Sequence, residues 1–92
     1  MKKKLQRIKV TYKRLKKYWG LSFSDGTIEI DSRIKGKKHL EILMHESTHV
    51  LFPDLTEEEV VEKSIIYMRT LWHEGYRRAE EDNTTPLQDG SI

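Results

Sequence analysis

The chain has 92 residues, of which 36% are hydrophobic and 35% are charged, so it can form one small core but not a second folded domain. A mean hydropathy of -0.73 and the lack of any apolar run of about 18 residues exclude a membrane-spanning helix, and the absence of cysteine excludes disulfides and thiolate metal ligands. The net charge of +2 hides a division between residues 1–40, with thirteen Lys/Arg and three Asp/Glu, and residues 41–92, with four Lys/Arg and twelve Asp/Glu.

Residues 1–7 are predicted to be a basic N-terminal tail. Charged residues interrupt positions 5–17 every two or three residues, so the apolar segment of a signal peptide is missing and we expect a cytoplasmic protein. The basic half also carries Tyr12, Tyr18 and Trp19, a combination that would suit nucleic acid or an acidic partner. A solubilising tail and a solvated face explain the same charges without any partner.

The first part of the chain is predicted to form strands. Residues 6–13 alternate between apolar and basic side chains, which favours a half-buried strand. Residues 15–23 are ambiguous, but the turn signal Ser24-Asp25-Gly26 is followed by clean alternation over residues 27–31. We therefore expect a hairpin within a small antiparallel sheet of about three strands.

Two helices are predicted after Gly36. The first has apolar residues at helical spacing and should end before Pro53. The second should begin after Thr56, because Thr56 and Glu59 form a capping-box pattern, and should end near Gly75. Its expected inner stripe is Val61, Ile65, Met68 and Trp72. The predicted fold is thus α+β, a small sheet packed on a helix pair, with a domain over residues 8–78 and a polar, disordered tail over residues 79–92.

The sequence His45-Glu46-Ser47-Thr48-His49 matches the pattern H-E-x-x-H. Residues four apart lie one above the other on a helix, so both imidazoles can reach one metal ion. Glu46 lies about 100° round the helix and can address a metal-bound water instead. The spacing suits zinc with Glu46 as general base, which is the chemistry of peptide-bond hydrolysis.

The context of the motif favours ligands over surface histidines. One stripe of the helix is apolar: Leu40, Leu43, Met44, Ser47 and Leu51. The opposite face, with His45 and His49, also carries Ile42 and Phe52, so we expect the sheet to cover one face and another element to cover the other. The alternative is two partly buried structural histidines beside a chance Glu46.

A catalytic zinc site needs a third protein ligand and an open position. Four carboxylates follow the motif closely: Glu57, Glu58, Glu59 and Glu62. The first three already have local roles in capping the second helix or complementing its dipole. Glu62 has no such role and lies level with the histidines in an antiparallel helix pair. We therefore expect Glu62 to be the third ligand, with Glu58 as the alternative ligand and a surface salt bridge as the other explanation of Glu62.

The remaining histidines are expected to be non-ligands, because His73 lies three turns from Glu62 and His39 precedes the motif. A role for His73, Arg69 or Tyr76 in stabilising a developing oxyanion stays open, although surface or packing roles explain them as well.

The strand at residues 28–31, the segment Leu40–His49 and the Glu-rich helix after it resemble the compact zinc metallopeptidases of the ImmA/IrrE and SprT-like groups. The segment Leu71–Arg77 is similar to small phage- and prophage-encoded members. The resemblance covers about residues 8–78 and implies a minimal zincin-like fold in which His45, His49 and Glu62 bind zinc and Glu46 is the general base. Within these residues we expect no DNA-binding or sensor domain like that of those groups, and no Gly-x-x-His follows His49 as it would in a metzincin.

The leading hypothesis is a zinc-dependent endopeptidase acting on a protein or peptide, with residues 27–30 as a candidate edge strand that holds the substrate. A second hypothesis is a zinc-stabilised binding module that recognises DNA or a protein through its basic half and cleaves nothing. A third is a small phage effector that inhibits a host protein by stoichiometric binding.

Overall fold

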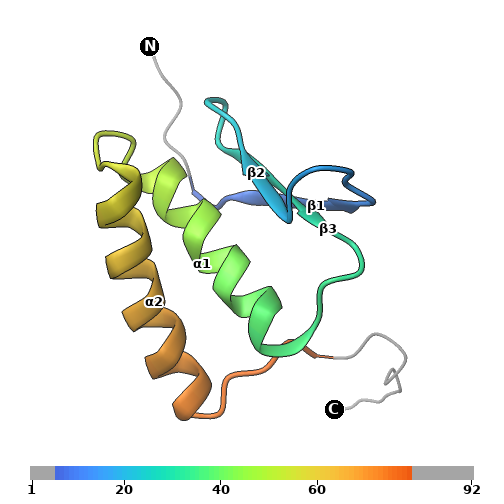
Figure 1. The fold of residues 1–92 in the computed structure, drawn as a ribbon, viewed down its shortest axis with the longest axis vertical. Coiled ribbons are helices and arrows are strands. Elements are labelled where there is room, and N and C mark those ends of the chain that lie inside the picture. The colour runs from blue at the N-terminus through green and yellow to red at the C-terminus, as the bar shows by residue number, and fades with distance from the viewer. Residues whose placement is uncertain (1–5, 80–92) are drawn as a thin grey trace.

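The computed structural model describes residues 6–79, so most of both predicted tails, residues 1–5 and 80–92, lies outside the described residues. The elements follow in the order β1 (Lys9–Lys13), β2 (Gly20–Ser22), β3 (Thr27–Asp31), α1 (Gly36–Leu51) and α2 (Glu57–His73). The predicted α+β architecture is confirmed. Figure 1 shows α1 between the sheet and α2, so both faces of the motif helix are covered, as expected.

The three strands form a mixed sheet in the order β1-β3-β2. The predicted hairpin is confirmed, because β2 pairs antiparallel with β3 around a turn in which Gly26 has φ of 90°. The expectation of a purely antiparallel sheet is wrong, because β1 pairs parallel with β3. The chain reverses direction once between β1 and β2 and again at the hairpin between β2 and β3. The neighbouring strands β1 and β3 therefore run in the same direction.

The central position of β3 also corrects the expected substrate strand. Residues 27–30 pair with β1 on one side and β2 on the other, so they offer no free edge. Ile28 and Ile30 are fully buried and form the core with Leu15, Val60 and Met68. The edge strand that lies against α1 is β2.

Asp31, at the end of β3, fastens the connection between β1 and β2. Its side chain is 1% exposed and accepts hydrogen bonds from the Leu15 backbone at 3.1 Å and from Arg33, whose Nη2 lies 2.7 Å away. These hydrogen bonds, first those from the Arg33 side chain, lower the pKa of Asp31 well below its ordinary range. The Asp31 backbone N–H also donates to the Trp19 carbonyl at 2.9 Å. The network holds the chain that enters β2 at Gly20.

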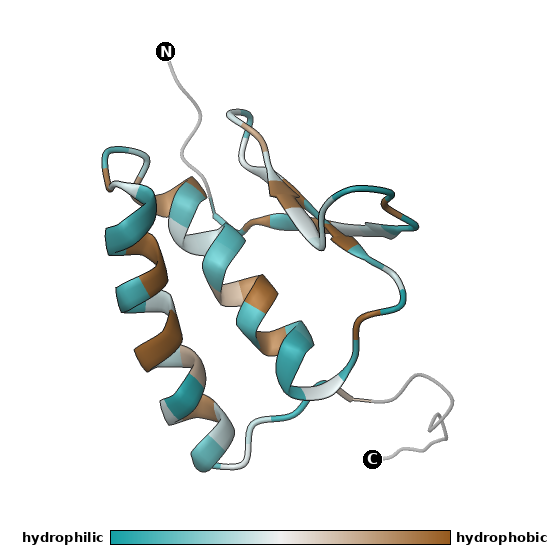
Figure 2. Cartoon of the chain, viewed as in Figure 1, coloured by the Kyte–Doolittle hydropathy of each residue, from teal (hydrophilic) through white to brown (hydrophobic). Residues whose placement is uncertain are grey.

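The helices begin and end where the sequence predicts. α1 ends at Leu51, two residues before Pro53. The Thr56 hydroxyl accepts a hydrogen bond from the Glu59 backbone, and the Glu59 carboxylate accepts one from the Thr56 backbone, which completes the capping box of α2. Gly75, with φ of 93°, follows the last turn of α2. Hydrophobic and hydrophilic residues alternate along both helices (Figure 2), and within residues 6–79 neither helix has the length and apolar character needed to cross a bilayer.

Candidate metal centre

α1 places His45 and His49 one turn apart on the same face. Their ring centroids lie 4.9 Å apart in an edge-to-face arrangement, and their side chains are 22% and 28% exposed. The i, i+4 spacing brings both Nε2 atoms to the same side of α1. The pair is therefore partly enclosed and keeps access to solvent.

The third member of the group is Glu57, the first residue of α2. Its Oε1 lies 2.8 Å from His49 Nε2 and its Oε2 lies 3.2 Å from His45 Nε2. One ligand atom from each of the three residues lies within 4.8 Å of the others. Ligand atoms bound at ~2.0–2.1 Å around a tetrahedral zinc are about 3.3–3.5 Å apart, so both distances from Glu57 to the histidines are close to those of a zinc site. The donor set, two imidazoles and one carboxylate, suits zinc and leaves one position open.

The structure does not bring Glu62 to the histidines. Glu62 and the alternative Glu58 are both exposed and lie outside the group that could hold a metal, which among residues 6–79 contains only His45, His49 and Glu57. The first turn of α2 follows α1 after a short loop, so Glu57 reaches the histidines while also starting the helix. A position at the helix terminus does not prevent a carboxylate from acting as a ligand.

The rotation of α2 explains the difference. The buried residues of α2 are Val60, Ser64 and Met68, whereas Val61, expected in the inner stripe, is 48% exposed. At about 100° per residue, Glu57 lies within about 60° of each buried position. Glu62 lies about 140° from Glu57 and points away from α1. The spacing between Glu57 and Val60 was the signal in the sequence that could have identified Glu57.

Glu46 lies beside the metal-ligand group on the sheet side of α1. It is only 9% exposed, and its carboxylate makes no hydrogen bond or ion pair with any other residue in the described range. Burying a carboxylate without a partner in the protein is costly, so such a group calls for a ligand or water as its partner. Glu46 and His45 line the same pocket, so a water molecule in that pocket can be the partner of the carboxylate.

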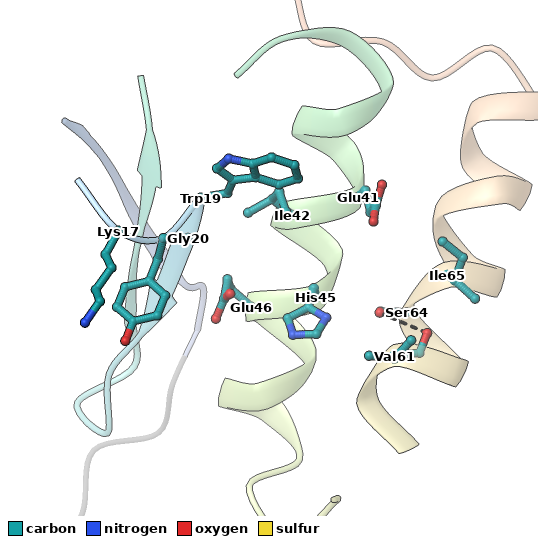
Figure 3. Close-up of a pocket in the computed structure, with 11 residues that line it drawn as sticks. Lys17, Trp19, Gly20, Glu41, Ile42, His45, Glu46, Val61, Ser64 and Ile65 are labelled. Carbon is teal, nitrogen blue, oxygen red and sulfur yellow. Dashed lines mark hydrogen bonds between the residues drawn. The ribbon is translucent and has the colours of Figure 1, made fainter. Parts of the chain in front are cut away.

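Glu46 and His45 line the same pocket, which has a volume of about 410 Å³ (Figure 3). Residues 17–20 form one wall of the pocket, and Val61, Ser64 and Ile65 of α2 contribute to the other. A Cβ atom on Gly20 would lie 3.1 Å from Glu46 Cγ, so the missing side chain at Gly20 lets β2 approach the Glu46 carboxyl closely. Gly20 cannot be recognised as part of the site from sequence, because an isolated glycine gives no sign of the helix that it will contact.

The other candidates lie away from the group. His39 is buried at the start of α1, where its Nε2 lies 2.9 Å from the Tyr12 hydroxyl. The side chain of His73 is 87% exposed, with Nδ1 3.7 Å from Glu74. Arg69 is exposed, and Tyr76 lines a different pocket from the one that contains Glu46. Sequence therefore identified three of the residues that the structure brings together at this end of α1, and geometry adds Glu57.

Comparison with known proteins finds no match for this chain among protein-family models, curated proteins or solved structures.

Proposed function

We propose that this chain is a zinc-dependent metallopeptidase that hydrolyses peptide bonds with an activated water. The observation that carries the proposal is the buried carboxylate of Glu46, which has no partner among the described residues and adjoins a group of two histidines and one glutamate. Two imidazoles, one carboxylate and an adjacent general base make up the residue set that catalytic zinc hydrolysis requires.

His45, His49 and Glu57 would hold the ion. A zinc ion bound there supplies Lewis acidity and lowers the pKa of its bound water toward about 7. The Glu46 carboxylate accepts a proton from the attacking water and returns it to the nitrogen of the departing amine. The low exposure of Glu46 keeps bulk water away from this proton transfer.

The substrate class that we propose is an extended peptide. β2 lies at the edge of the sheet, and its first residue, Gly20, lines the pocket that contains Glu46. An extended peptide can add to such an edge through backbone hydrogen bonds, which position a carbonyl without reading its side chains. The strand that would bind the substrate is therefore β2 and not residues 27–30, which lie in the centre of the sheet.

The test is Glu46→Gln, which preserves size and removes the base. We expect zinc content to equal that of the wild type and cleavage of a mixed peptide library, followed by mass spectrometry, to fall by about 10²–10⁴-fold. Glu41→Gln is the matched control, because Glu41 lines the same pocket on the same helix but forms an ion pair with Lys38 at 3.2 Å. Equal cleavage by Glu46→Gln and wild type, or loss of zinc from Glu46→Gln, would contradict the mechanism.

A second candidate, a zinc-stabilised module that binds nucleic acid or a host protein without cleavage, is favoured by the chain between β1 and β2. Tyr18 and Trp19 are each 55% exposed there, next to the exposed cations Arg14, Lys16 and Lys17. DNA affinity that falls steeply with salt, together with no cleavage of the peptide library, would support this module over the peptidase.

A further inference from the structure

A second, larger pocket lies on the other side of α1, at the end of the molecule that contains His39. Its volume is about 820 Å³, within the range of about 300–1,000 Å³ that is typical of small-molecule sites. It is formed by β1, the first half of α1, the end of α2 and residues 76–79. None of the residues that line it belongs to the candidate metal centre.

The floor of this pocket is apolar. α1 contributes Leu40, Leu43 and Met44, and α2 contributes Leu71 and Trp72. All five are only partly buried, so the described chain leaves a continuous apolar surface exposed between the two helices. At about 100° per residue, Leu40 and Met44 lie about 100–180° round α1 from His45 and His49, so the apolar floor and the metal ligands are on different faces of α1.

The rim of the pocket is cationic. Lys35, Arg77 and Arg78 line it, and no Asp or Glu does so within residues 6–79. The guanidinium of Arg77 lies 3.4 Å from the centre of the Trp72 ring, and that of Arg78 lies 4.5 Å from the centre of the Tyr12 ring. Stacking on aromatic rings fixes both guanidinium groups at the edge of the apolar floor and leaves N–H groups for an anion.

His39 and Tyr12 form the polar wall of this pocket. The pKa of His39 is lowered, first by burial and then by the positive charges of Arg78 and Lys35. His39 is only 6% exposed and is paired with the Tyr12 hydroxyl. His39 and Tyr12 therefore form a polar wall beside Lys35 and Arg78, and no carboxylate within residues 6–79 lines this pocket.

We propose that this pocket binds an amphipathic anion, namely a long-chain carboxylate. Its hydrocarbon chain lies on the apolar floor between α1 and α2, and its carboxylate is bound by Lys35 and Arg78. Charge complementarity selects this occupant, because a neutral apolar ligand would leave the cationic rim without a partner, and a small anion would leave the apolar floor exposed.

The test uses the full chain carrying Trp19→Phe, which leaves Trp72 as the only tryptophan because the sequence contains two. Dodecanoate is titrated below its micelle concentration while Trp72 fluorescence is recorded. We expect a saturable response with one dodecanoate per chain. Arg78→Gln and Lys35→Gln should each weaken binding by at least about tenfold, as loss of a charge-assisted hydrogen bond does.

Arg69→Gln is the matched control, because Arg69 is an exposed arginine of α2 that does not line the pocket. The Arg69→Gln variant should bind dodecanoate with the same affinity as the parent chain. Dodecyl maltoside, which has the same chain and a neutral head, should bind at least about tenfold more weakly. Circular dichroism establishes that each variant is folded before titration. No saturable response, equal binding of dodecyl maltoside, or equal losses in Arg69→Gln and Arg78→Gln would overturn the proposal.

Discussion

The close contact between β2 and α1 at Gly20 makes a sharp prediction for Gly20→Ala. An added Cβ would lie 2.6 Å from Ile42 Cγ2 and 3.1 Å from Glu46 Cγ. The Ile42 methyl is attached at a branched Cβ, so it cannot move away without a change of χ1. Either β2 or the Ile42 and Glu46 side chains must therefore shift.

The expected cost follows from two opposing effects. Overpacking of this kind costs about 1–3 kcal/mol, whereas replacing glycine by alanine recovers about 0.4–1 kcal/mol by restricting the unfolded chain. A net loss of about 1 kcal/mol lowers the Tm of a domain of this size by about 4–8 °C. Thermal unfolding followed by circular dichroism measures the shift directly.

A double-mutant cycle with Ile42→Ala isolates the contact. Because Ile42→Ala removes the methyl that the new Cβ would meet, the double variant should be more stable than the sum of the single changes predicts, by at least about 0.5 kcal/mol. Gly75→Ala is the control, since Gly75 has φ of 93° and nothing within 4 Å of an added Cβ, so its cost should add to that of Ile42→Ala. Additive effects for Gly20→Ala, or a Tm above that of the wild type, would refute the steric reasoning.

Three further predictions concern stability. Thr56→Ala removes the cap of α2, so it should lower the free energy of unfolding in urea by about 1 kcal/mol. Thr70→Ala is the control: it removes an exposed hydroxyl within the same helix and should change the free energy of unfolding by less than about 0.5 kcal/mol. Ile30→Val should cost about 0.5–1.5 kcal/mol in the same assay, since Ile30 is fully buried, and an unchanged midpoint would contradict its place in the core. Arg33 lowers the pKa of Asp31 from its ordinary value of 3.8, so the stability that Asp31 contributes is complete above about pH 4 and is lost as the pH falls toward the lowered pKa. The loss in free energy of unfolding caused by Asp31→Asn should therefore shrink between neutral pH and about pH 2. A loss that stays constant over this range would refute the linkage.

Local signals in the sequence predicted the helices and the hairpin correctly. Thr56 and Glu59 accept hydrogen bonds from each other's backbone N–H groups, and Gly26 adopts the positive φ that the turn requires. Neither feature depends on the rest of the fold. The partner of β1 depends on the rest of the fold. Alternation predicts which side chains of β1 face the core but carries no information on whether the neighbouring strand is parallel. The parallel pairing with β3 was therefore not predicted.

The candidate site also has a part that follows from local sequence and a part that depends on the rest of the fold. His45, Glu46 and His49 lie on one turn of one helix, so their relative positions follow from sequence spacing. The third carboxylate comes from another helix, and its identity depends on how far α2 is rotated about its axis. The buried residue Ser64 is polar and Val61 is exposed, so the apolar pattern misplaced the inner face and favoured Glu62 over Glu57.

The most direct test of the account is the zinc affinity of the untagged chain and of Glu57→Ala, Glu58→Ala and Glu62→Ala, measured by competition with a chromogenic chelator and by metal content. The geometry predicts one zinc per wild-type chain, with the same affinity in Glu58→Ala and Glu62→Ala. Loss of a residue that only hydrogen-bonds a metal ligand can lower metal affinity by roughly 100-fold. Because Glu57 is a proposed ligand itself, the zinc affinity of Glu57→Ala should fall by at least as much. Zinc affinity that is unchanged in Glu57→Ala, or reduced only in Glu62→Ala, would contradict the proposed centre, and a wild-type chain that binds no zinc would contradict the proposed function.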